Sequence, residues 1–413
     1  MSTTSAASLP AGKAGLRQDA QVIGLVGIAH LVSHFSQLLL APLFPWLKDA
    51  FGVGYAELGF LMTIFFVVSC AVQAASGFVV DRFGPRPVLF GGLALLALAA
   101  FGYATSTQYW MLALWSVVAG LGNGVFHPVD YTLLNRKISP ARLGHGYSVH
   151  GITGSLGWAL APALLVPVTI AVSWRTALVC AGVFATAVLV LLLVHGDKLA
   201  LPAAPAAKPG AAADSSFGFL RIPAVWMCFG FFFFYAMALG AVQAFAPGAA
   251  RELHAVPVAQ AALCLTVYMV CSAAAMVGGG FLVADPTRCE KVVAIGIGFA
   301  ACVALCLGLL DVPGALVPVL FGLMGLGAGL AGPSRDMIVK RATPPNASGR
   351  VYGVVYSGLD IGQAIAPLVF GTLMDRQQYR AIFVGLALVQ AVLIASAFNV
   401  GRVRRTPAAP AHA

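Results

Sequence analysis

Three short stripes of polar residues stand out in a chain that is otherwise strongly apolar. The first is His30, His34 and Gln37, whose i, i+4, i+7 spacing places them on one face of a helix. Two histidines at this spacing can hold a metal ion, but the signal is weak without a nearby glutamate or a third ligand. We rank a proton or hydrogen-bonding site that lines a cavity first, a structural helix contact second and a metal site last. We therefore expect no metal and no cofactor.

The second stripe, Asn123, His127 and Asp130, repeats this spacing. Asp130 is a candidate proton-coupling carboxylate, because removal from water favours the neutral form of a carboxyl group and lets it load and release a proton. A structural or gating ion pair is an equally weighted alternative, since charged groups inside membranes usually pair.

The third stripe consists of Tyr356, Asp360 and Gln363, again with helical spacing. Asp360 has no obvious basic partner in the sequence. It is either a site for a proton or a substrate cation, which we favour, or a carboxylic acid kept neutral by hydrogen bonds. His150 stands alone, and we expect a packed, hydrogen-bonded histidine there.

The rest of the chain indicates that these stripes lie within a membrane. Of its 413 residues, 60% are hydrophobic and 9% are charged, and the mean hydropathy is +0.91. Runs of about 20 apolar residues, long enough to cross a bilayer as helices, follow one another from Gln21 to Val400. They are apolar on every face, unlike the alternating strands of a membrane barrel. We predict an all-α membrane protein with twelve transmembrane helices.

The distribution of charge predicts the orientation in the membrane. The net charge of +10 could suggest nucleic-acid binding, but most of the 24 lysines and arginines fall in alternate loops and at the two ends of the chain. By the positive-inside rule, both termini lie in the cytoplasm of a bacterial-type inner membrane. The first 20 residues lack the features of a removable signal peptide, so the first helix is expected to remain.

The chain divides almost in half at a segment rich in alanine and proline. We expect a cytoplasmic tail (1–20), a six-helix bundle (21–195), a cytoplasmic linker (196–222), a second six-helix bundle (223–400) and a second cytoplasmic tail (401–413).

An internal repeat supports two related bundles. At an offset of 205 residues, Gly120-Leu121-Gly122 aligns with Gly325-Leu326-Gly327, and several further glycines, prolines and arginines coincide. Six spans return the chain to its starting side, so the halves are parallel and related by an axis along the membrane normal. Transporters of this architecture bind substrate near mid-membrane between the halves. Asp130 aligns with Arg335, which suggests an ion pair between them as one alternative.

A short motif lies at the end of the second predicted helix, which spans residues 57–80, and in the loop that follows it. It reads Gly77-x-x-x-Asp81-Arg82-x-Gly84-Pro85-Arg86. Gly77 permits close approach of a neighbouring helix, and a carboxylate at Asp81 can sit against the positive end of another helix. The arginines can anchor the loop on the cytoplasmic side.

This motif resembles the signature loop of the major facilitator superfamily, and the resemblance extends over essentially the whole chain. It implies that Asp81 and Arg82 help to close an inner gate. Further details are similar to the fosmidomycin-resistance group of exporters, including Phe126-His127-Pro128. Gly154-x-x-Gly157 is similar to the antiporter motif of the fifth helix.

The resemblance and the polar residues together predict a monomeric secondary transporter of a small organic solute, with proton-coupled export favoured. Uptake of an organic anion through Arg335, or a membrane sensor that binds without transport, are alternatives. An enzyme is not expected, and no phosphate-binding loop suggests ATP hydrolysis. The expected proton-coupling residues are Asp360, Asp130 and His34, and the expected cavity residues are His30, His34, Gln37, Gln73, Asn123, His127, Arg335, Tyr356 and Gln363.

Overall fold

The computed structural model describes residues 11–139, 142–201, 223–282, 288–342 and 348–405. Within these ranges, all regular secondary structure is helical, and twelve helices are long and apolar enough to span a membrane. The elements are α1 (Ala11–Gln37), η1 (Ala41–Leu43), α2 (Phe44–Phe51), α3 (Tyr55–Phe83), α4 (Pro85–Thr105), α5 (Tyr109–Asn123), α6 (Phe126–Lys137), α7 (Leu143–Ala171), α8 (Trp174–Val194), η3 (Gly196–Leu199), α9 (Pro223–Ala244), α10 (Ala246–His254), α11 (Val258–Leu282), α12 (Cys289–Leu309), η6 (Gly314–Leu316), α13 (Val317–Ala342), α14 (Ser348–Asp375) and α15 (Tyr379–Arg405).

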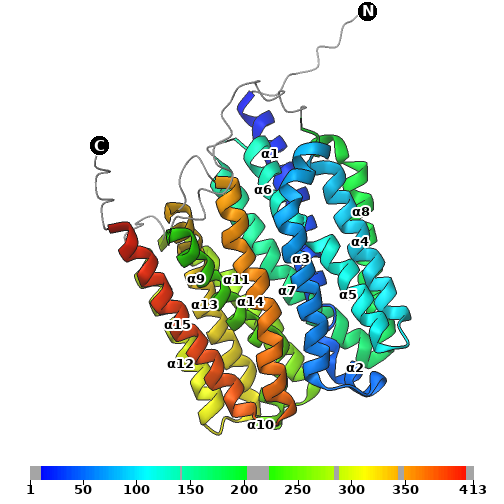
Figure 1. Ribbon diagram of the computed structural model, residues 1–413, viewed down its shortest axis with the longest axis vertical. Coiled ribbons are helices and arrows are strands. Elements are labelled where there is room, and N and C mark those ends of the chain that lie inside the picture. Colours follow the sequence, from blue (N-terminus) through cyan, green and yellow to red (C-terminus); the bar gives the residue numbers. More distant parts are fainter. Residues whose placement is uncertain (1–10, 140–141, 202–222, 283–287, 343–347, 406–413) are drawn as a thin grey trace, which may run out of the picture.

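The helices form two six-span bundles that stand side by side (Figure 1). In the first half α1 packs on α7, and α4 packs on α5 and α8; in the second, α11 packs on α13, and α14 on α9. The halves meet where α3 lies along α14 and α7 along α11. The start of α1 and the end of α15 lie at one end of the bundles, here called the terminal side, and α2 and α10 lie at the opposite end, the far side.

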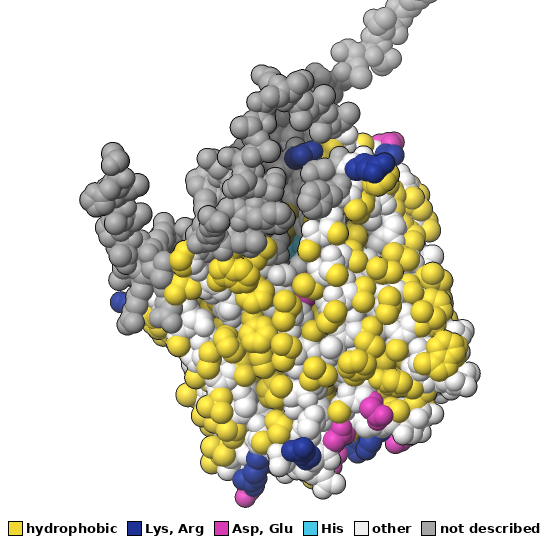
Figure 2. All heavy atoms as spheres, in the orientation of Figure 1, with side chains coloured by type: hydrophobic (Ala, Val, Ile, Leu, Met, Phe, Trp, Pro, Cys, Tyr) yellow, Lys and Arg dark blue, Asp and Glu magenta, His cyan; other side chains and the backbone are white. Residues whose placement is uncertain are grey.

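The surface matches a protein surrounded by lipid. Hydrophobic side chains cover the middle of the face shown in Figure 2, and charged side chains gather at its two ends. Large apolar residues such as Val67 and Ile295 are more than half exposed. In water such a surface would be costly, but in hydrocarbon it needs no cover, because lipid tails are as apolar as the side chains.

Glycines bring the helices of each half together in the same way. A Cβ added to Gly122 would lie 2.8 Å from the carbonyl oxygen of Gly92, and one on Gly327 would lie 2.5 Å from that of Gly296. Gly120 and Gly124 approach α3 in the same manner as Gly325 and Gly329 approach α11. The repeat predicted from the sequence is therefore a repeat of helix packing, and close packing is the role of these glycine runs.

Three long apolar segments are not continuous helices, and in two of them proline stands at the start of the helix that follows the break. The first span breaks after Gln37, and the chain restarts at η1 with Pro42 and at α2 with Pro45. Because proline lacks a backbone N–H, the start of a helix is where it costs least. Pro247 begins α10 in the same way. The fourth span divides between α5 and α6, directly after Asn123.

Two helices extend beyond the predicted ends of the bundles. Helix α1 begins at Ala11 rather than near residue 21, and α15 continues to Arg405 rather than ending at 400. The early start of α1 has a tertiary cause, since Asp19 accepts hydrogen bonds of 2.8 Å from Ser139 Oγ and Arg142 Nε, close to the start of α7. Most of the predicted linker, residues 202–222, lies outside the described residues.

Candidate functional site

A buried cluster of histidines surrounds Asp130 in the first half. Asp130 Oδ2 lies 3.0 Å from His30 Nδ1 and 3.1 Å from His150 Nε2. The rings of His30 and His150 stack with centroids 3.5 Å apart. His34 continues the cluster, with its ring 4.2 Å from those of both His30 and Trp158. Helices α1, α6 and α7 thus converge on one carboxylate.

Two glycines on α7 make room for this cluster. A Cβ on Gly154 would lie 2.7 Å from the His34 ring and 3.1 Å from His30 Nε2, and one on Gly157 would collide with the carbonyl oxygen of Leu31. The Gly154-x-x-Gly157 pattern therefore has a local physical purpose. It lets α1 lie directly against α7 and leaves space for the imidazole rings.

Asn123, the last residue of α5, ties together the helices around the cluster. Its Oδ1 accepts hydrogen bonds from Ser33 Oγ at 2.8 Å and Gln37 Nε2 at 3.3 Å. Its Nδ2 donates to Ser69 Oγ at 2.9 Å. Trp158 Nε1 donates to Gln37 Oε1 at 2.9 Å, which adds α7 to the network. Buried polar groups of this kind fix helix positions because leaving any of them unpaired is costly.

A second polar chain crosses from one half to the other. Gln73 Nε2 on α3 donates to Asp360 Oδ2 on α14 at 3.0 Å, and Gln73 Oε1 lies 2.9 Å from His127 Nδ1 on α6. An amide oxygen only accepts, so His127 donates through Nδ1. Asp360, Gln73 and His127 therefore form one hydrogen-bonded chain at the interface between the halves. Nearby, the hydroxyl groups of Tyr131 and Tyr356 lie 3.5 Å apart.

Arg335 lies apart from Asp130. Its guanidinium carbon is 4.4 Å from the ring centroid of Tyr235 and 5.5 Å from that of Phe232, an arrangement typical of cation–π contacts. The suggested ion pair between Asp130 and Arg335 is wrong in this structure, because both charge contacts of Asp130 are histidines. The 205-residue offset relates equivalent positions in separate bundles, and equivalence does not place side chains in contact.

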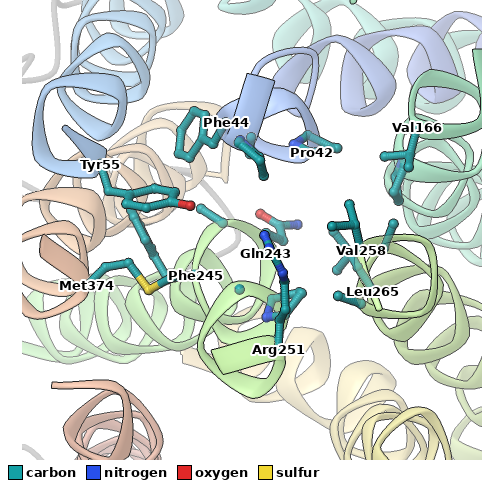
Figure 3. Close-up of a pocket in the computed structure, with 18 of the residues that line it drawn as sticks. Pro42, Phe44, Tyr55, Val166, Gln243, Phe245, Arg251, Val258, Leu265 and Met374 are labelled. Atoms are coloured by element: carbon teal, nitrogen blue, oxygen red, sulfur yellow. The ribbon is translucent and has the colours of Figure 1, made fainter. Parts of the chain in front are cut away.

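The far side holds an open cavity between the halves (Figure 3). Its empty space, which includes volume open to the outside, is about 670 Å³. Its walls come from η1, α2, α3, α7, α9, α10, α11 and α14. Gln243 lies near its middle with Arg251 beside it, while Val166, Val258 and Leu265 form an apolar wall. Gln243 Oε1 accepts a hydrogen bond of 2.9 Å from Gln363 Nε2.

None of the cavity residues predicted from the sequence lines this space. They are engaged in contacts between helices, because the halves pack directly on one another at that level. Arg335 lines a different, smaller pocket of about 190 Å³ within the second half. The sequence missed Gln243 and Arg251, since each is a single polar residue without the repeated spacing that marks a stripe. His150 was expected to be packed and hydrogen-bonded, and in the structure it is buried with a hydrogen bond of 3.1 Å between its Nε2 and Asp130 Oδ2.

Beside the cavity, hydrogen bonds join α3 to α14 across the two halves. Asp375 Oδ1 and Oδ2 accept hydrogen bonds of 2.8 Å from the backbone N–H groups of Tyr55 and Ala56, at the start of α3. Thr63 Oγ1 donates to the carbonyl oxygen of Ala364 at 2.6 Å. A carboxylate at a helix N-terminus is stabilised by the exposed N–H groups and the helix dipole.

The loop motif lies on the terminal side. Gly84 has φ of 81°, which glycine adopts readily, and it separates α3 from α4. Arg86 Nη1 lies 3.7 Å from Asp197 Oδ1, and Arg82 lies over the ring of Phe83. The structure does not describe the surroundings of Gly77 or the side chain of Asp81, and the gate role implied for Asp81 and Arg82 stays a prediction.

Comparisons with known proteins place these features in context. The family model described as "Major Facilitator Superfamily" matches residues 26–322 and 229–413. A solved bacterial homologue of the human lysosomal transporter Spinster, in an inward-facing and occupied conformation, superposes with a TM-score of 0.76 at 12% identity. The superposition covers 94% of this chain and 99% of that one.

Relatives in sequence carry several different names. The chain is 28% identical over 134 residues to a "Multidrug resistance protein B homolog" of Mycobacterium tuberculosis, and 27% identical over 151 residues to the "Fosmidomycin resistance protein" of Escherichia coli. These alignments span 32% and 35% of this chain, and only 25% and 35% of the relatives. A "Probable nitrate/nitrite transporter NarK2" of Mycobacterium tuberculosis is 24% identical over 94% of this chain and 98% of its own length.

Proposed function

Because this chain belongs to the major facilitator superfamily and is a membrane transporter, we propose that it exports a small organic solute in exchange for protons. The two halves would expose a central site alternately to the two sides of a bacterial inner membrane, with both termini in the cytoplasm. The names of the drug-resistance relatives favour export.

The hydrogen-bonded chain from Asp360 through Gln73 to His127 is the observation that carries the proposal. Asp360 belongs to the second half, and both of the other residues belong to the first. An ionised carboxylate accepts a stronger hydrogen bond than a neutral acid does. Gain of a proton at Asp360 would therefore weaken a bond that joins the halves, and loss of the proton would restore it. The proton would thus be coupled to the movement that exposes the substrate. The roles predicted for Asp130 and His34 stay predictions.

The test uses purified protein in liposomes that contain a pH-sensitive dye. Candidate solutes, among them fosmidomycin and other small organic acids and cations, are added under a defined pH gradient. We expect solute-dependent proton flux with the sign of antiport. Asp360→Asn should abolish gradient-driven flux and leave solute exchange without a gradient. Asp311→Asn, an exposed far-side carboxylate 3.5 Å from Arg380, is the matched control. Unchanged flux in Asp360→Asn would remove this residue from coupling.

Uptake of an organic or inorganic anion together with protons is the second candidate. It is favoured by the full-length similarity to the probable nitrate/nitrite transporter. Arg251 in the far-side cavity could contact an anion, although it lies 3.7 Å from Glu252, which lines the same cavity. The same liposomes decide between the two, because symport moves protons with the solute and antiport moves them against it. Solute binding without any flux would favour the sensor hypothesis instead.

A further inference from the structure

The cluster around Asp130 contains more ligating atoms than hydrogen bonds can satisfy. His30 and Asp130 are 2% and 0% exposed. Although His30 Nδ1 lies only 3.0 Å from Asp130 Oδ2, the ring is oriented so that this nitrogen forms no hydrogen bond, and Asp130 Oδ1 has none either. Buried polar atoms without a hydrogen-bond partner are uncommon in folded proteins, so these two atoms indicate a position where a ligand could bind.

The separations are compatible with one metal ion, although the 3.1 Å contact between His150 Nε2 and Asp130 Oδ2 is a hydrogen bond in this structure. In a tetrahedral zinc site, metal–ligand distances of about 2.0–2.1 Å place neighbouring ligand atoms about 3.3 Å apart. Asp130 Oδ2, His30 Nδ1 and His150 Nε2 are within 4.8 Å of one another, and the two distances from the carboxylate are 3.0 and 3.1 Å. The lone pair of an imidazole nitrogen lies in the plane of its ring. Because the His30 and His150 rings are stacked with 24° between their planes, one of the two rings would turn when both bind the same ion.

Charge selects between two possible ligand sets. His30, His34 and His127 also have ring nitrogens within 4.8 Å of one another, but these three ligands are neutral when they bind a metal. A divalent ion buried without a counter-charge is strongly unfavourable. Only the set that contains Asp130 supplies an anion, and this charge distinguishes the two sets. Both contain atoms without a hydrogen bond, because His34 Nδ1 lacks a partner as well.

We propose that His30, Asp130 and His150 bind one divalent transition-metal ion of the zinc class. Two imidazoles and one carboxylate are a ligand set that such ions accept. Three protein ligands leave a fourth position open, so the ion would be exchangeable and would be able to take a further ligand. The three residues come from α1, α6 and α7, and an ion held between them would join these helices within the first half.

The experiment measures binding, not transport. Full-length protein, purified in detergent and stripped with a chelator, is titrated with ZnCl₂ in a calorimeter. Co²⁺ is then added as a spectroscopic probe, because its visible absorption distinguishes four-coordinate from six-coordinate sites. We expect one ion per chain in a low-coordinate site.

Substitutions identify the ligands. His30→Gln, Asp130→Asn and His150→Gln should each weaken Zn²⁺ binding at least about tenfold, while Asp130→Glu should retain most of it. Two controls should bind as the unmodified protein does: His127→Gln, from the all-histidine set, and His195→Gln, at the end of α8. Each variant is first checked for a monodisperse elution profile and an unchanged Tm without metal.

Two results would overturn the proposal. One is binding by the unmodified protein that is no tighter than binding by Asp130→Asn. The other is loss of binding in His127→Gln with retention in Asp130→Asn. Because the titration contains neither solute nor gradient, it is independent of the proposed transport. Zinc binding without solute flux would support the metal site and contradict the proposed function. Solute flux without zinc binding would support the proposed function and contradict the metal site.

Discussion

The two halves of this transporter share their packing but differ in their chemistry. Gly157 lets α7 approach α1 at Leu31, and Gly362, 205 positions later, lets α14 approach α9 at Phe233. At the same offset, the polar cluster of the first half is replaced by other residue types. The pairs are His30 with Tyr235, His34 with Leu239, His127 with Gly332, His150 with Val355 and Asp130 with Arg335.

This difference teaches that the helix scaffold does not require the histidines. The second half achieves the same close helix contacts without histidines, and of the five equivalent positions only Arg335 is charged. Burying four histidines and a carboxylate costs more than burying Leu239 or Val355, because polar groups lose their contacts with water. The buried histidines and Asp130 are therefore best explained by a function of the first half. The glycines are explained by the helix packing that both halves share.

The largest effect should come from breaking the shared scaffold. We expect Gly157→Val and Gly362→Val each to prevent folding, because their side chains would collide with a backbone carbonyl oxygen that cannot move independently. The yield of monodisperse protein and the Tm measure this. Gly24→Ala and Gly230→Ala are matched controls in α1 and α9, since nothing lies within 4 Å of an added Cβ at either position. Equal tolerance of all four changes would refute a common packing role.

A charge exchange between the halves should have the next largest effect. The double variant Asp130→Arg with Arg335→Asp should be at least as inactive as either single variant. Arginine would replace the carboxylate that contacts His30 and His150, and aspartate cannot make the contact of Arg335 with the Tyr235 ring. Liposome flux is the readout. Recovery of activity in the double variant would show that the two residues pair in another conformation of the cycle.

A moderate effect is expected where the halves are joined on the far side. Asp375→Ala removes two hydrogen bonds from a charged acceptor, each worth about 1.5–3 kcal/mol. If these bonds exist only while the far-side ends of α3 and α14 are in contact, the equilibrium constant for separating these ends should rise at least about tenfold. Thiol labelling of a cysteine introduced at Met374, at the cavity wall, reports the change.

The control for this change is Glu57→Gln. Glu57 accepts a hydrogen bond from the backbone of Gly54 within the first half, so its loss should leave labelling unaltered. Equal labelling in Asp375→Ala and the unmodified protein would mean that Asp375 does not hold the halves together.

The smallest effect on stability should come from the pair Arg86 and Asp197 on the terminal side. The two groups are 3.7 Å apart and their side chains are 43% and 106% exposed. Ion pairs in water contribute little. Asp197→Asn should therefore leave Tm unchanged within error, and a clear fall would reveal a structural role. A loss of flux in Arg86→Gln at constant Tm would support the gate role implied for the loop.

Much of the fold could be predicted from the sequence because lipid imposes a simple rule. Long apolar runs must become helices, so their number and the two-bundle arrangement follow, and both are confirmed. The breaks at Pro42 and Pro45 and the early start of α1 were missed. The prolines are tolerated only because a new helix begins there, and Asp19 is held by residues more than one hundred positions away.

The candidate site was predictable in part. Regular spacing marked His30, His34, His127 and Asp130, and the structure brings them together. The contact between Gln73 and Asp360 could not be predicted, because it joins α3 to α14 and the sequence of one helix does not indicate which residue of the other it contacts. The sequence analysis ranked a metal site last because it found no third ligand near His30 and His34. In the folded protein, Asp130 and His150 lie beside His30.

The contact at Asp375 has a consequence for how this protein can change over time. Its donors are the backbone N–H groups of residues 55 and 56, which every amino acid except proline possesses. Sequence drift at those two positions would therefore leave the donors in place. The only side chain in these two hydrogen bonds is that of Asp375, so a single substitution in α14 can change them without any compensating change in α3.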